Sequence, residues 1–139
     1  SPFHWVPDMR FVHKYLLLAH SPKHYDALGR LVAGAAKVPR SSLEESYGPL
    51  FMEALAVKST TKKNVNVLHH ILGFLKDKLA AREKEEILAV IDEYHREIVP
   101  LVVPLTLLRH FVKVHDVEYI NNQVYLHPHP KELMLRNHV

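Results

Sequence analysis

Apolar side chains recur every three or four positions along most of the chain, which is the spacing of one face of an α-helix. Phe11, Tyr15 and Leu18 repeat in this way near the start, and Leu68, Ile71 and the leucines that follow do so near the middle. The pattern predicts six main helices, over residues 8–19, 21–37, 42–57, 61–79, 81–98 and 104–115.

Residues with capping preferences mark the starts of several of these helices. The pair Ser21-Pro22 is a strong start signal, because serine caps free backbone N–H groups and proline fits the first helical position. Ser42 and Glu45 match a capping box, which predicts a helix start there. Thr60 or Thr61 can cap the fourth helix in the same manner.

Beyond residue 115 the pattern predicts only short elements. We expect a helical turn over Tyr119–Gln123, an extended segment over 127–130, where proline disfavours the helical region in the preceding residue, and a last helix from Lys131. The sequence has no alternating strand runs and no Asn-Gly or Asp-Gly hairpin signal. The predicted fold class is therefore all-α, a single helical bundle with short C-terminal helical elements.

Length and composition narrow the class of protein. The 139 residues, 47% of them hydrophobic, predict one domain over residues 1–139 with one core. The absence of cysteine excludes disulfides and thiolate ligands, and it fits a reducing cytoplasm. The longest uncharged apolar stretch, Ile98–Leu108, contains two prolines and is shorter than the ~20 residues that a membrane span needs. We therefore expect a soluble, cytoplasmic protein with no membrane partner.

The charges are unevenly distributed. The net charge is only +3, but residues 1–76 carry ten basic and five acidic side chains, while residues 77–97 carry four and seven. This segregation is compatible with a basic binding surface, and equally with ordinary solvated helices.

The twelve histidines suggest metal binding first, but their spacing argues against it. His69 and His70 are adjacent on a helix and point about 100° apart, whereas chelating pairs lie three or four residues apart. His110 and His115 diverge similarly. No G-x-S-x-G motif or glycine-rich phosphate loop is present. We therefore predict no catalytic residue, no metal and no cofactor.

One face of the fourth predicted helix carries polar residues suited to RNA. Lys63, Asn66, His70 and Gly73 lie on this face, opposite the apolar stripe, and Lys62 accompanies Lys63 in the first turn. Unpaired amides at a helix start favour anions, so this end could receive a phosphate. The alternative is an exposed helix whose glycine packs against a neighbour.

The sixth predicted helix and the tail add further candidates. Arg109, His110 and Lys113 share a polar face, and with Lys63 they would form one phosphate-binding surface. The C-terminal tail, residues 129–139, could bind RNA or could be a solvated charged segment. The candidate RNA contacts are Lys62, Lys63, Asn66, His70, Arg109, His110, Lys113, His129, Lys131, Arg136 and Asn137.

At these residues the chain resembles the YbgA-like domain, a bacterial family that occurs alone or fused to a thiouracil or thiouridine desulfidase module. The resemblance covers most of the chain and rests on blocks in 16–22, 63–73, 100–110 and 125–137. It implies an accessory helical domain. In fused relatives this domain is thought to hold transfer RNA while a cysteine-ligated iron–sulfur module removes sulfur from 4-thiouridine.

Together, the residues and the resemblance predict a non-catalytic accessory domain that binds structured RNA, with tRNA as the expected partner. The alternative is a protein-interaction domain that docks a desulfidase or another partner. An enzyme or metal site centred on the histidines is the least favoured class.

Overall fold

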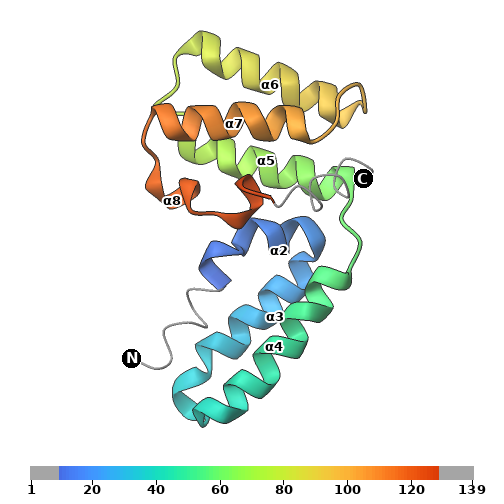
Figure 1. The fold of residues 1–139 in the computed structure, drawn as a ribbon, viewed down its shortest axis with the longest axis vertical. Coiled ribbons are helices and arrows are strands. Elements are labelled where there is room, and N and C mark those ends of the chain that lie inside the picture. Colours follow the sequence, from blue (N-terminus) through green and yellow to red (C-terminus); the bar gives the residue numbers. More distant parts are fainter. Residues whose placement is uncertain (1–9, 129–139) are drawn as a thin grey trace.

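The structure, a computed structural model, describes residues 10–128, and within this range it is all-α with no strand (Figure 1). The all-α prediction is confirmed. The longer helices are α2 (Lys14–His20), α3 (Pro22–Ala33), α4 (Arg40–Ala56), α5 (Thr61–Leu75), α6 (Ala81–His95) and α7 (Val102–Val114). The short elements are α8 (Glu118–Asn121) and the 3-10 turns η1 (Ala35–Lys37) and η2 (Val124–Leu126). Residues 129–130 of the expected extended segment, and the last helix expected from Lys131, lie outside the described residues.

Two of the expected caps are present and one is wrong. The side chain of Ser21 accepts from the His24 N–H at the start of α3, and that of Thr60 accepts from the Lys63 N–H at the start of α5. The capping box expected at Ser42 does not form, because α4 already begins at Arg40. Pro39 precedes it with the extended backbone of an N-cap residue, so the chain can enter the helix two residues earlier.

Several helix ends differ from the predicted ones. The first helix, expected over 8–19, is interrupted by a turn at His13, and α2 begins at the next residue. The fourth ends at Leu75 rather than at Leu79, and the sixth begins at Val102, which still places Pro104 in its first turn. The repeat of apolar residues predicts which segments are helical but does not locate their ends to the residue.

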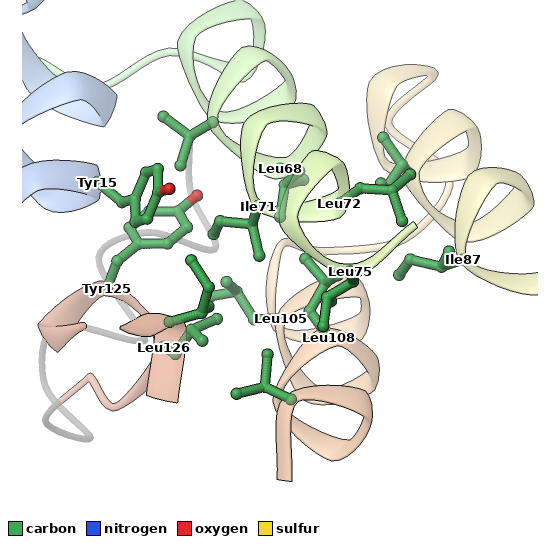
Figure 2. Packing of buried hydrophobic residues seen from close by; sticks show 14 of the residues in the cluster. Tyr15, Leu68, Ile71, Leu72, Leu75, Ile87, Leu105, Leu108, Tyr125 and Leu126 are labelled. Carbon is green, nitrogen blue, oxygen red and sulfur yellow. The ribbon is translucent and has the colours of Figure 1, made fainter. Parts of the chain in front are cut away.

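The buried hydrophobic residues form two clusters rather than the single core expected. The larger cluster lies among α2, α5, α6 and α7 and includes Leu68, Ile71 and Leu105, and the smaller lies among α2, α3 and α4 (Figures 1 and 2). α2 contributes to both, because Leu16 packs in the larger cluster and Leu17 in the smaller. α2 therefore joins two helical layers into one body.

A buried polar network ties α2 and η2 to the start of α5. The Asn64 amide donates to Ser59 Oγ and to the Thr60 carbonyl, both at 2.9 Å, and its Oδ1 accepts from the Tyr125 hydroxyl at 2.6 Å. Ser59 in turn donates to the Ala19 carbonyl at 2.8 Å. Asn64 and Tyr125 are fully buried, so these bonds are shielded from water.

The segment after α8 is fixed to α2 by a second buried amide. Gln123 donates to the Phe11 carbonyl at 2.7 Å and accepts from the Tyr15 N–H at 3.4 Å. Two residues later, Tyr125 packs beside Tyr15 in the larger cluster, with the two hydroxyls directed to the same side (Figure 2). The C-terminal elements are therefore held by contacts with the start of the described chain.

We predict that Asn64→Ala lowers the free energy of unfolding by about 2–3 kcal/mol, because it removes the three side-chain hydrogen bonds that Asn64 makes with Ser59, Thr60 and Tyr125 in a buried network. Urea unfolding measures this. Asn66→Ala is the matched control, since Asn66 is exposed two residues further along α5, and its cost should stay within about 0.5 kcal/mol. Equal losses for both variants would contradict the role given to the network.

Candidate nucleic-acid interface

A pocket of about 390 Å³ lies beside the second half of α7. Its lining residues are Thr106, Arg109, His110, Lys113, Asn121 and His127. The α7 residues among them lie at i, i+3, i+4 and i+7 and are exposed, whereas Leu105, Leu108 and Val112 of the same helix are buried. The polar face expected on the sixth helix is therefore present, and α8 and η2 turn it into a concave site.

Contacts with the backbone orient two of the pocket side chains. Arg109 donates from Nη1 to the Leu126 carbonyl at 3.4 Å. The His127 Nε2 lies 2.6 Å from the Asn121 carbonyl. A carbonyl only accepts, so this nitrogen carries the proton and a neutral ring leaves Nδ1 free as an acceptor. Within residues 10–128, neither Arg109 nor Lys113 forms an ion pair.

A carboxylate lies close to this pocket. Glu83, in the first turn of α6, accepts from the Ala80 N–H at 2.9 Å and lies 3.4 Å from His115 Nε2. The hydrogen bond from the Ala80 N–H is the largest cause that lowers the pKa of Glu83. Burial opposes it as the next largest effect, and His115 and then His110 lower the pKa further. Glu83 therefore interacts with the histidines, while Arg109 and Lys113 remain the fixed positive charges of the pocket.

The face predicted on the fourth helix is only partly free. Lys62, Asn66 and His70 are exposed on α5, as expected. The Lys63 amine instead donates to the His20 carbonyl at 2.7 Å and to the Lys58 carbonyl at 3.1 Å. Lys63 thus binds the end of α2 to the connection between α4 and α5, which is a structural contact.

The structure separates Lys63 from the pocket. Successive helices α5, α6 and α7 run in alternating directions, so α5 and α7 run in the same direction (Figure 1). Lys63 lies in the first turn of α5 and Lys113 in the last turn of α7, so the two residues lie at opposite ends of this layer. The structure brings Arg109, His110 and Lys113 together and does not add Lys63 to them.

The glycine of the predicted α5 face has open space around it. A Cβ added to Gly73 would meet no atom within 4 Å. The alternative of an exposed helix is therefore wrong only in its detail that this glycine packs against a neighbour. The tail candidates His129, Lys131, Arg136 and Asn137 lie outside the described residues.

Sequence reasoning did not find Asn121 and His127 as pocket residues, because only the folded path of α8 and η2 brings them to α7. It also did not find the buried Asn64. A signal for Asn64 existed: it precedes Leu68 by four residues and Ile71 by seven, which places it on the core face of the helix.

A hydrogen-bonded chain runs from Ser21 through His24 to Glu53. A serine, a histidine and a carboxylate follow one another in it, as they do in a hydrolytic triad. Ser21 Oγ lies 2.7 Å from His24 Nδ1, and His24 Nε2 lies 3.1 Å from the Glu53 carboxylate. Ser21 Oγ also accepts from the His24 N–H as the cap of α3, and the residue is only 5% exposed. The arrangement therefore fits a helix cap better than an accessible nucleophile.

Within residues 10–128, no three histidine, aspartate or glutamate side chains lie together in a way that could hold a metal ion. In the same range, every helix is too short or too polar to cross a bilayer.

Comparison with known proteins gives two matches. The model of a family described as "Protein of unknown function (DUF1722)" matches residues 14–130. The "Uncharacterized protein YbgA" of Escherichia coli (strain K12) is 27% identical over 133 residues, which cover 94% of this chain and 78% of that protein. No solved structure matches the chain.

The lowered pKa of Glu83 generates a prediction about acid stability. A carboxyl whose pKa is lowered by folding stabilises the protein above its unfolded value, near 4.5, and this contribution is lost as the pH falls through the folded value. Glu83→Gln should therefore lower the melting temperature at pH 7, and its curve should converge with that of the wild type in acid. Thermal melts from pH 7 to pH 3 test this.

The control for that experiment is Glu85→Gln, which removes the same charge from an exposed position of α6. We expect it to change the melting temperature little at either pH. A loss at pH 7 as large as that of Glu83→Gln would show that net charge, and not the contacts of Glu83, is responsible.

Proposed function

The chain belongs to the DUF1722 family, and from this premise we propose that it is an accessory domain that binds structured RNA, in the first place tRNA. The observation that supports the proposal is the pocket, where Arg109 and Lys113 lie beside His110 and His127 without an ion pair among the described residues. Guanidinium and ammonium groups are the protein groups that bind phosphate oxygens best.

The chemistry of the pocket favours recognition of the backbone over recognition of sequence. Lysine and arginine contacts to phosphates release counterions and are independent of base identity. The exposed Lys62, Asn66 and His70 on α5 would add polar contacts to a second part of a large, folded RNA. A protein that reads shape in this way suits a partner with a defined fold, such as tRNA.

We propose further that this domain assists the removal of sulfur from 4-thiouridine in tRNA. The chain has no cysteine, so a separate desulfidase module would supply the iron–sulfur cluster and the chemistry. The role of the domain would be to hold the RNA while that module acts, without catalysis of its own. A cytoplasmic location is consistent with a cysteine-free composition and a tRNA partner.

We predict that the domain retards bulk tRNA in a gel and that the affinity falls steeply as salt rises. Arg109→Ala should weaken binding roughly tenfold, because a charged hydrogen bond to phosphate is lost. It should also reduce the slope of log affinity against log salt by roughly 0.7–0.9, the value for one phosphate contact. Titrations at several salt concentrations measure both effects.

Arg30→Ala is the matched control, because Arg30 is an exposed arginine of α3, in the other helical layer. It removes the same charge and should leave the affinity and the slope nearly unchanged. Equal effects of the two variants would indicate diffuse attraction by net charge and would exclude the pocket as the site.

An exposed group of aromatic rings supports a second candidate function, the docking of a protein such as the desulfidase module. Tyr119 contacts Phe11 and Phe74, each with a distance of 4.9 Å between ring centroids. The three residues are 37%, 41% and 48% exposed, respectively. Aromatic residues are enriched at protein interfaces. Failure to bind tRNA even at low salt, together with capture of a purified desulfidase that Phe74→Ser abolishes, would favour this function.

A further inference from the structure

We propose that the α7 pocket binds a phosphate at the end of an RNA chain, a phosphomonoester, rather than a phosphodiester within the chain. The inference rests on the proposed function and specifies the part of the RNA that the pocket recognises. It follows from the grouping of the cations, from their number, and from the size of the cavity.

The two cations of the pocket line the same cavity. Arg109 and Lys113 lie one turn apart on the same face of α7, and Asn121 at the end of α8 and His127 just after η2 line that cavity with them. A protein that follows the backbone of a duplex or a long single strand needs cations spread along a track. Convergent donors around one cavity are better suited to a single anionic group.

The charge of the pocket matches a terminal phosphate better than an internal one. A phosphomonoester carries about −1.5 to −2 charges at pH 7 and presents three oxygens, whereas a diester carries one charge. Arg109 can bind two of these oxygens with its planar fork while Lys113 binds as a point charge. The carboxylate of Glu83 contacts His115, and among the described residues it forms no ion pair with Arg109 or Lys113.

The volume of the pocket exceeds what a phosphate alone would fill. A cavity of about 390 Å³ is in the range of ligand sites, which begins at roughly 300 Å³, so the terminal nucleoside can enter with its phosphate. His127 donates from Nε2 to the Asn121 carbonyl, so its other ring nitrogen, Nδ1, is the one that could accept a hydrogen bond from a ribose hydroxyl. The pocket therefore offers cations for the phosphate and an acceptor for the sugar.

The test uses the full chain and short single-stranded RNAs of one sequence that differ only at their ends. One carries a 5′-phosphate, one a 3′-phosphate, and one has hydroxyls at both ends. Fluorescence anisotropy should show roughly tenfold tighter binding of one phosphorylated RNA than of the RNA without a terminal phosphate, as expected for an added charged hydrogen bond. Which of the two binds tighter identifies the end that is recognised.

Two variants and one competitor complete the test. Arg109→Ala should remove the preference for the phosphorylated end, and Arg30→Ala should retain it; melting curves of both should match the wild type. A nucleoside monophosphate should compete with the preferred RNA, and the nucleoside without phosphate should not. If the 5′-phosphorylated RNA is the preferred one, removal of the 5′-phosphate of tRNA with phosphatase should weaken tRNA binding by a similar factor.

The outcomes separate this inference from the proposed function. If tRNA binds through Arg109 but the three short RNAs bind equally, the proposed function stands and the terminal-phosphate inference is overturned. If the monophosphate binds while tRNA and the short RNAs do not, the pocket takes a phosphomonoester from a small molecule and the RNA function fails. Binding of none of these probes overturns both.

Discussion

The side chain of Asn64 is the contact on which the arrangement of the helices depends most. Its amide and carbonyl connect the start of α5 with Ser59 on one side and with Tyr125 on the other. Ser59 in turn donates a hydrogen bond to the Ala19 carbonyl, near the end of α2. A buried amide that lost one of these partners would leave unpaired groups in a medium of low polarity, so the network favours one mutual placement of α2, α5 and η2.

This placement determines where the candidate binding residues lie. Tyr125 is held by Asn64, and Gln123 is held by the backbone of Phe11 and Tyr15, so η2 and the residue after it have a fixed position. His127 follows directly and closes the pocket against α7. The residues around Tyr125 form one of the blocks by which the chain resembles the YbgA-like domain. These residues therefore stabilise the fold, in addition to any role in binding.

The sequence predicted local features well and tertiary ones less well, for physical reasons. The caps at Ser21 and Thr60 were predicted correctly because a cap depends on residues within one turn. The predicted start of α4 at Ser42 was wrong. The helix begins at Arg40, because Pro39 already has the extended backbone of an N-cap residue and no capping box at Ser42 is needed. Of the site, the face of Arg109 and its neighbours was predictable from helical spacing. The partners that α8 and η2 bring to it were not, because they depend on long-range contacts.

The groups that give the protein stability and those proposed to bind RNA are largely different. Asn64 and Tyr125 are buried, whereas Arg109 and Lys113 are exposed and must lose rotamer freedom when they bind a ligand. The contact of Arg109 with the Leu126 carbonyl removes part of that freedom in advance, and Lys113 has no comparable restraint among the described residues. Lys63 belongs to the first group, because its amine is used by two backbone carbonyls at the end of α2. A positive charge in a sequence can therefore serve either purpose, and only its partners in the folded chain distinguish the two.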